Sequence, residues 1–342
     1  MSFNDIWGQT RAVERLRAMS AGDKVPSALL FYGPSGVGKR RAAIELAKAI
    51  NCEKGGADPC GDCPQCVETE KGLHPDVRVV DREYRAATAK DPKGEYRSAL
   101  SSGNENKMEQ FLEKQTSLRI DTIREIRKSM THKPIFGKHK AGILDDAHEM
   151  TVEAANALLK SLEEPGPRSH WILISSQREN MLPTILSRCQ PVRFLALESE
   201  ILKRVLVERC SLAAETAARW SRWAGGSVER ALALGRHEAA AASAPWDAPG
   251  GAHEFASRLP REAHRAREEA AGLLTLWSLL LRGFWLEDSV GRAEAARTLK
   301  NLLRLQGDLK RNASAALVMH VAVLEVQALC RKFSISPLRF TM

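Results

Sequence analysis

A phosphate-binding loop near the N-terminus constrains the fold of this chain more than any other feature. Residues 33–40 read GPSGVGKR, and they lie between the apolar run Ala28–Tyr32 and a helix-forming segment. This order of strand, loop and helix is the context that the P-loop pattern requires. Gly33, Gly36 and Gly38 let backbone N–H groups turn inward around a polyphosphate, and the helix N-terminus adds its positive dipole end. The sequence therefore predicts an α/β fold that holds phosphate at this turn.

The last two positions of the loop give opposite indications. Lys39 is placed to reach the outer phosphates of a nucleotide. Position 40, where the pattern requires a Ser or Thr hydroxyl to coordinate Mg²⁺, is Arg40 instead. Because a cation does not ligate a cation, the loop is predicted to bind ATP or ADP weakly or without hydrolysing it.

The composition is that of a soluble globular protein with room for several domains. Of the 342 residues, 44% are hydrophobic and 27% are charged. No stretch approaches the length of a membrane span, and the N-terminus lacks a secretory apolar region, so we expect a cytoplasmic protein with no membrane partner. The net charge of +9 permits contact with nucleic acid but does not establish it.

The distribution of apolar runs predicts an α/β part followed by a helical part. The runs that we expect to form buried parallel strands are Ala28–Tyr32, Val77–Val80, Ala141–Leu144 and Trp171–Ile174. Residues 81–117 are polar and are predicted to form a long surface loop or a partly disordered insertion. Beyond Leu197 the pattern is helical. We therefore expect an α/β P-loop domain over residues 1–196, a small helical domain over 197–240 and an all-helical domain over 252–342.

Four clustered cysteines predict a structural zinc site. Cys52, Cys60, Cys63 and Cys66 have the spacing C-x7-C-x2-C-x2-C, which lets four thiolates converge on one Zn²⁺ and leaves no open coordination position. The module would cover residues 52–66. The alternatives are a set of free buried cysteines, a thioredoxin-like redox pair, or a zinc site in which His74 replaces one cysteine.

A second motif places two acids at the end of an apolar strand. Residues 141–148 read AGILDDAH. In a P-loop protein the first acid, here Asp145, organises Mg²⁺, and the second, here Asp146, polarises the attacking water. Seven basic residues precede this strand, and we favour a solvated helix face for them over a DNA-binding surface: Arg119, Arg124, Arg127, Lys128, Lys133, Lys138 and Lys140.

Two further motifs complete a recognisable set. Residues 156–165 read NALLKSLEEP, and residues 187–189 read SRC. With the P-loop, the cysteine cluster and the DDAH strand end, they resemble the clamp-loader branch of the AAA+ ATPases. The resemblance implies a RecA-like parallel sheet, a helical lid and a helical collar that assembles with other subunits. It makes Arg188 an arginine finger that reaches a nucleotide on the neighbouring subunit. Active members usually carry Glu where this chain has Asp146, whose carboxylate is one methylene shorter.

The resemblance also implies roles for residues that no local pattern would single out. Ser176 matches the sensor-1 position, Arg230 matches the sensor-2 region, and a short N-terminal box near the adenine comprises Ile6, Gly8 and Gln9.

We expect a non-hydrolysing subunit of the replicative clamp loader, an accessory subunit of the DNA polymerase that helps to place the sliding clamp on primed DNA. Its partners would be the motor and other subunits of the loader, the clamp and primer–template DNA. The alternative is a motor ATPase of the same complex, which Arg40 disfavours, as does the lack of a long C-terminal extension. A third hypothesis is a stand-alone zinc-stabilised nucleotide switch without a role at DNA.

Overall fold

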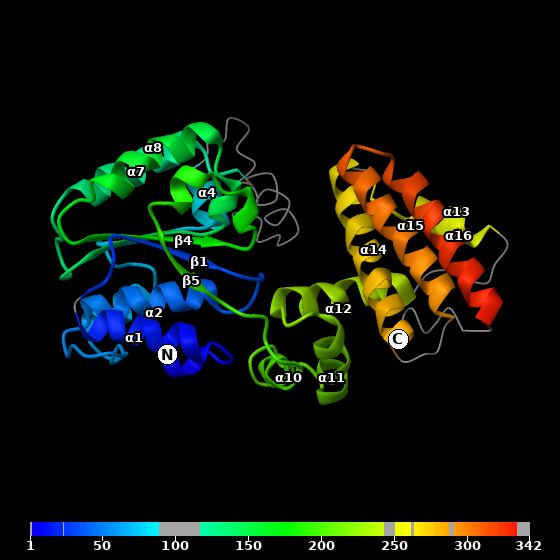
Figure 1. Cartoon of the computed structure of the whole chain (residues 1–342), viewed down its shortest axis with the longest axis horizontal. Helices are drawn as coiled ribbons and strands as arrows, with labels where there is room; N and C mark the ends of the chain where they lie inside the picture. Colours follow the sequence, from blue (N-terminus) through cyan, green and yellow to red (C-terminus); the bar gives the residue numbers. More distant parts are fainter. Residues whose placement is uncertain are drawn as a thin grey trace. The chain divides into compact units, whose positions relative to one another are not determined.

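The chain divides into two compact units, residues 1–197 and residues 198–342 (Figure 1). The computed structural model describes residues 2–22, 24–88, 117–242, 250–260, 263–286 and 291–333. The predicted division into three domains stays a prediction.

The first unit is built on a five-stranded parallel sheet with the order β2-β3-β4-β1-β5. Its strands are β1 (Ala28–Tyr32), β2 (Val77–Val80), β3 (Lys140–Leu144), β4 (Ser169–Ser175) and β5 (Gln190–Arg193). Its helices are η1 (Phe3–Asp5), α1 (Thr10–Ala21), α2 (Lys39–Asn51), α3 (Pro64–Glu70), α4 (Arg82–Thr88), α7 (Ile120–Thr131), η2 (Ala147–Glu149), α8 (Val152–Glu163), η3 (Arg178–Asn180) and α9 (Pro183–Leu186). The four predicted strands are confirmed, and β3 and β4 begin one and two residues earlier than expected.

The fifth strand was not predicted. β5 is short, contains Pro191 and begins and ends with the polar residues Gln190 and Arg193. It therefore lacks the apolar run of a buried strand. It pairs with β1 at the edge of the sheet, where proline is tolerated because no second neighbour needs its missing N–H.

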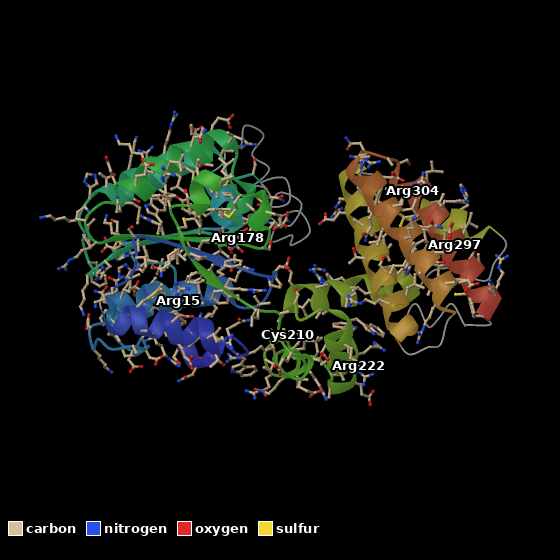
Figure 2. The ribbon with its side chains drawn as sticks, in the orientation of Figure 1. Arg15, Arg178, Cys210, Arg222, Arg297 and Arg304 are labelled. Carbon is tan, nitrogen blue, oxygen red and sulfur yellow. The ribbon has the colours of Figure 1, made fainter. Side chains whose placement is uncertain are left out.

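Helices cover both faces of the sheet, α1 and α2 on one and α7 and α8 on the other (Figure 1). The α7 and α8 side contains an apolar core, in which Trp171 of β4 is fully buried. A Cβ at Gly142 of β3 would lie 3.0 Å from the Trp171 ring, so this large side chain needs a glycine beside it. At the carboxyl end of β1, the Arg178 guanidinium lies 4.8 Å from the centroid of the Tyr32 ring (Figure 2).

The prediction of a loop over residues 81–117 is wrong for its first residues, because helix α4 directly follows strand β2. The Asp81 carboxylate accepts a hydrogen bond from the Tyr84 N–H at 2.8 Å and so caps the first turn. Arg85 is buried and donates to Glu149 at 2.8 Å, which fixes the helix against the strand ends. Residues 89–116 of the predicted loop lie outside the described residues.

The second unit is helical throughout its described part. Its helices are α10 (Ser199–Glu208), α11 (Ala214–Trp223), α12 (Val228–Ala242), α13 (Gly251–Ser257), α14 (Ala263–Leu286), α15 (Arg292–Lys310) and α16 (Ala315–Phe333). α14, α15 and α16 pack on one another, and Trp277 of α14 is fully buried. Helix α12 continues as far as Ala242. Across the described ranges, no helix combines the length and apolarity needed to cross a membrane.

A buried aspartate fixes the segment that leads into β3. The side chain of Asp76 accepts hydrogen bonds from the backbone N–H groups of Ile135, Phe136 and Gly137, at 2.7 to 3.0 Å. Its carboxylate also lies 3.8 Å from Nζ of the buried Lys140. Burial alone would raise the pKa of Asp76, but the three N–H donors and Lys140 outweigh it and lower the pKa below its ordinary value.

We predict that Asp76→Asn destabilises the first unit by about 3 kcal/mol at neutral pH, because it leaves Lys140 buried without its counter-charge. The pKa of Asp76 is lowered in the folded state, so its contribution is present above the unfolded-state pKa of about 3.9 and is lost as the pH falls through the lower folded value. Urea unfolding at several pH values measures this. The difference between variant and wild type should shrink in acid.

The exposed Asp121→Asn on α7 is the control and should unfold like the wild type. A destabilisation of Asp76→Asn that stayed constant in acid would contradict the assignment.

Candidate nucleotide and metal sites

The P-loop has the backbone geometry of a phosphate cradle. Gly33, Gly36 and Gly38 have φ of 145°, 65° and 96°, values that side chains rarely adopt. A Cβ at Gly33 would lie 2.1 Å from the Phe194 carbonyl oxygen, so only glycine fits this close approach. The loop ends at Gly38, the N-cap of the 13-residue helix α2, whose first N–H groups have no partner within the helix.

Lys39 and Arg40 point to different partners. Lys39 is buried, and its Nζ donates to the carbonyl oxygens of Gly33, at 2.7 Å, and Pro34. Arg40 is half-exposed; its guanidinium pairs with the Asp81 carboxylate after β2, and its Nε lies 3.9 Å from Asp145 Oδ2 after β3. Arg40 therefore connects the phosphate-binding helix to the ends of two strands.

The second acid of the DDAH motif has its own cations. Asp146, in the left-handed conformation with φ 50°, lies 3.5 Å from Arg82 and 3.8 Å from Arg85 of α4. Burial and the neighbouring Asp146 raise the pKa of Asp145, and Arg40 opposes the rise. The two motif acids thus each face guanidinium groups of the same chain. No local pattern in the sequence indicates the roles of Asp81, Arg82 and Arg85, although Asp81 follows a predicted strand.

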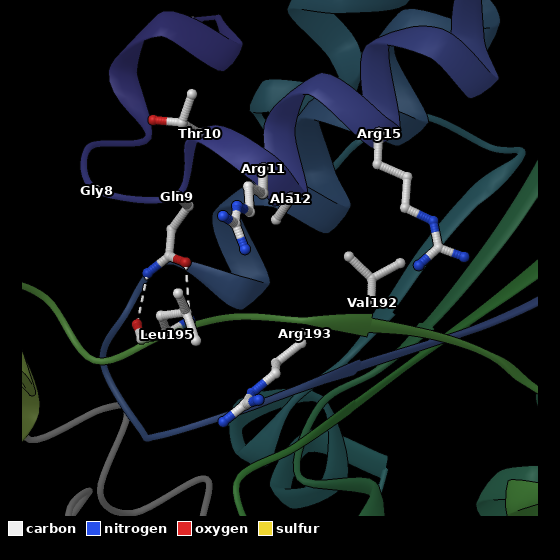
Figure 3. Close-up of a pocket in the computed structure, with 9 residues that line it drawn as sticks. All are labelled: Gly8, Gln9, Thr10, Arg11, Ala12, Arg15, Val192, Arg193 and Leu195. Carbon is white, nitrogen blue, oxygen red and sulfur yellow. Dashed lines mark hydrogen bonds between the residues drawn. The ribbon is translucent and has the colours of Figure 1, made fainter.

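The N-terminal box lies beside the P-loop. Gln9 is buried, and its side-chain amide forms two hydrogen bonds with the backbone of Leu195, at 2.7 and 2.9 Å (Figure 3). A Cβ at Gly38 would contact Ile6 at 3.4 Å. Gly8 and Gln9 line a pocket of about 600 Å³ between the start of α1 and the end of β5. The guanidinium groups around it belong to Arg11, Arg15 and Arg193.

The candidate finger is held by an ion pair within its own subunit. Arg188 follows α9, and its Nε donates to Glu163 Oε1 at 2.6 Å at the end of α8. Its Nη1 donates to the Thr184 carbonyl oxygen at 3.0 Å. Roughly a third of the side chain remains exposed (36%). No sequence motif predicted Glu163 as the partner of Arg188.

The two sensor candidates lie in different units. Ser176 follows β4 and is half-buried, while the preceding Ser175 accepts a hydrogen bond at its carbonyl from the Gly33 N–H, at 3.3 Å. Strand β4 therefore contacts the P-loop through Ser175. Arg230 is exposed on α12 of the second unit, where its N–H donates to Ser227 Oγ at 3.1 Å.

The four clustered cysteines converge as the spacing predicts. The Sγ atoms of Cys52, Cys60, Cys63 and Cys66 all lie within 4.8 Å of one another. Burial opposes ionisation of Cys60, but N–H groups of Cys63 and Asp62 lower the pKa of its thiol to about 6. Burial raises the pKa of the Cys66 thiol. Four thiols so placed fit one tetrahedral Zn²⁺, which would tie the end of α2 to the start of α3.

His74 has another role. Its Nδ1 accepts from the Asp76 N–H at 3.0 Å, and its Nε2 lies 2.6 Å from the Gln65 side-chain oxygen. Gln65 in turn donates to the Phe136 carbonyl oxygen at 2.9 Å. With both ring nitrogens engaged, His74 stands outside the cysteine cluster and links α3 to the segment held by Asp76.

Ion pairs attach the cysteine module to the P-loop helix. Arg41 donates to both carboxylate oxygens of Glu70, at 2.6 and 2.8 Å. The buried Lys48 lies 3.0 Å from Glu45 and 2.8 Å from Glu70. Hydrogen bonding from Arg41 lowers the pKa of Glu70 to about 2, against an opposing effect of burial. Helix α3 is therefore fixed on α2.

The seven basic residues that precede the AGILDDAH motif do not form one surface. Lys140 is buried and pairs with Asp76, and Lys138 Nζ donates to the Cys52 carbonyl oxygen at 2.8 Å. Arg124 is exposed on α7 near Asp121, as expected of a solvated helix face. Arg127 of α7 donates through Nε to Ser161 Oγ of α8 at 3.0 Å, so three of the seven make structural contacts.

The sheet order, the P-loop after β1 and the paired acids after β3 together define a P-loop protein of the AAA+ class. The sequence profile described as "DNA polymerase III, delta subunit" matches residues 8–198, more than half of the chain. The chain belongs to this family.

Curated relatives carry the names of two subunit types. A delta′ subunit of DNA polymerase III from Bacillus subtilis is 31% identical over 201 residues, 59% of this chain and 52% of that protein. A delta′ subunit from Pseudomonas aeruginosa is 33% identical over 193 residues, 55% of this chain and 50% of that protein. A tau subunit from Bacillus subtilis is 31% identical over 201 residues, 58% of this chain and 30% of that protein. The chain spans about half the length of these delta′ relatives.

The residues fit the two implied metals differently. The convergent thiols fit zinc, which would be structural because four protein ligands leave no position for substrate. At the P-loop, Mg²⁺ requires oxygen ligands in octahedral geometry. Arg40 supplies none and already pairs with Asp81 and Asp145, so the residues present do not fit Mg²⁺.

We predict that Cys63→Ser removes zinc from the protein and lowers the melting temperature of the first unit. Because metal binding and folding are coupled, we expect a fall of about 10 °C, roughly 3 kcal/mol for a unit of this size. Metal content by mass spectrometry and thermal unfolding test it.

Cys210→Ser, in the second unit and outside the cluster, should change neither quantity. The zinc site would be contradicted if the wild-type protein contained no metal as purified and melted at the same temperature as Cys63→Ser.

Proposed function

We propose that this protein is a delta′-type subunit of the bacterial clamp loader that does not hydrolyse ATP. It braces the complex, donates Arg188 to the nucleotide of a neighbouring subunit and so helps to load the sliding clamp onto primer–template DNA during replication. Its partners are the gamma/tau and delta subunits, and its location is the cytoplasm. The family and the names of the delta′ relatives support this proposal.

The observation that carries the proposal is the engagement of the hydrolytic acids by guanidinium groups. Asp145 faces Arg40, and Asp146 faces Arg82 and Arg85. A carboxylate so engaged is poorly placed to activate water, since a general base must contact the proton that it removes. Arg40 also lacks the hydroxyl that would coordinate an Mg²⁺ ion beside the γ-phosphate. The site is thus unsuited to phosphoryl transfer.

The role of Arg188 in trans is supported by its position and by its pairing with the Glu163 carboxylate. Glu163 holds the guanidinium while leaving part of the side chain exposed. A neighbouring triphosphate carries more negative charge than one carboxylate, so it would compete effectively for this guanidinium. Such a finger stabilises charge that develops on the transferred phosphoryl group.

The second unit presents apolar side chains that suit assembly. Leu317, Val321 and Leu324 of α16 are exposed at helical spacing, and Leu303 is exposed on α15. Exposed apolar stripes of this kind support contact with other subunits, as expected of a collar. The lid role of α10 to α12 and the sensor roles of Ser176 and Arg230 belong to the same proposal.

The alternative is a gamma/tau-type ATPase motor. The tau relative from Bacillus subtilis, as similar as the delta′ relative over the matched region, favours it. Arg40 and the paired acids oppose it, because a motor needs Mg²⁺ and a free catalytic carboxylate.

ATP turnover decides between the two. We predict that the purified chain alone has no turnover, and that a complex assembled with clamp-loader motor and delta subunits hydrolyses ATP. Arg188→Ala should leave the chain folded and reduce turnover about a thousandfold at the one site that it serves, the usual effect of losing an arginine finger.

Arg204→Ala, an exposed arginine paired with Glu208, is the matched control. Unchanged turnover of the Arg188→Ala complex would refute the finger, and turnover by the isolated chain would favour the motor.

A further inference from the structure

The carboxyl end of the sheet carries charges that would repel a nucleotide if they stood alone. Asp81 follows β2 and Asp145 follows β3, and the two strands are neighbours. In a metal-dependent P-loop site, Mg²⁺ neutralises such acids and bridges them to the phosphates. Here the Arg40 guanidinium contacts both carboxylates. The positive charge that a metal would bring is already part of the chain.

The same contacts exclude the metal. Mg²⁺ in such a site would need oxygen ligands at about 2.1 Å, from the protein or from its retained waters. The carboxylates of Asp81 and Asp145 form ion pairs with Arg40. A second cation beside this guanidinium would be repelled. Position 40 offers no hydroxyl.

The parts that contact phosphate directly are retained. The glycine conformations, the N-terminus of α2 and the buried Lys39 are those of a phosphate cradle. We propose that this P-loop binds nucleoside di- and triphosphates as metal-free anions, with Arg40 as a built-in counter-ion in place of Mg²⁺.

The inference rests on the proposed non-hydrolysing role, because it describes the ligand of the same site. Metal-free binding also predicts little discrimination between ADP and ATP. Without a bridging metal, a γ-phosphate gains no metal–ligand bond, so ADP and ATP should bind similarly.

The test is titration of the full chain with fluorescent N-methylanthraniloyl-ADP and -ATP, in EDTA and in Mg²⁺. The wild type should bind both probes in EDTA with affinities within about twofold of each other, and Mg²⁺ should not tighten binding. Arg40→Ser restores a hydroxyl and releases the acids, so its binding should be at least about tenfold tighter in Mg²⁺ than in EDTA. Arg40→Lys keeps the charge and should remain independent of Mg²⁺.

Two further variants complete the design. Lys39→Ala should weaken binding in both conditions, and the exposed Arg124→Ser should bind like the wild type. Circular dichroism verifies that each variant is folded.

The inference is overturned by wild-type binding that needs Mg²⁺, by an Arg40→Ser variant that ignores Mg²⁺, or by no binding of either probe. None of these results would remove the finger role, since Arg188 acts on the nucleotide of a neighbour. Conversely, normal turnover of the Arg188→Ala complex would refute the finger and leave metal-free binding intact.

Discussion

Charge compensation at the carboxyl end of the sheet is the constraint on which the first unit depends. Parallel strands bring their ends to one edge, and here that edge carries Asp81, Asp145 and Asp146. Carboxylates so close together would repel one another in a partly buried site. Arginines from α2 and α4 supply the opposite charge and also attach these helices to the sheet. The same arginines therefore hold the helices on the sheet and pair with the acids that a metal ion would need.

Much of this architecture follows from sequence because buried parallel strands are apolar and short. That rule located β1 to β4, and the glycines and Lys39 located the phosphate cradle. The rule did not locate β5, because an edge strand can contain proline and polar residues. The rule did not locate α4, because the Arg85–Glu149 ion pair that holds this helix joins residues far apart in the chain.

At the candidate site, too, the chemistry of single residues was predictable from sequence, whereas contacts between distant segments were not. That Arg40 cannot ligate Mg²⁺ is evident from its chemistry alone. That it pairs with Asp81 requires knowing that β2 lies next to β3, which no local pattern states. The Arg188–Glu163 pair likewise depends on how α8 and α9 meet. Local chemistry identified the convergent cysteines, because all four lie within one short segment.

The two sites share a single helix. α2 begins at the phosphate cradle and ends next to Cys52, and its 13 residues span about 20 Å. Arg41 and Lys48 of α2 both pair with Glu70 of α3, the helix that follows the cysteines. In mechanical terms, α2 is a strut with one site at each tip. A tilt of about 3° around the cysteine end would move the phosphate end by about 1 Å, since the lever arm is the full helix length. A shift at the cysteine end of α2 would therefore be carried to the phosphate-binding loop through the length of this helix.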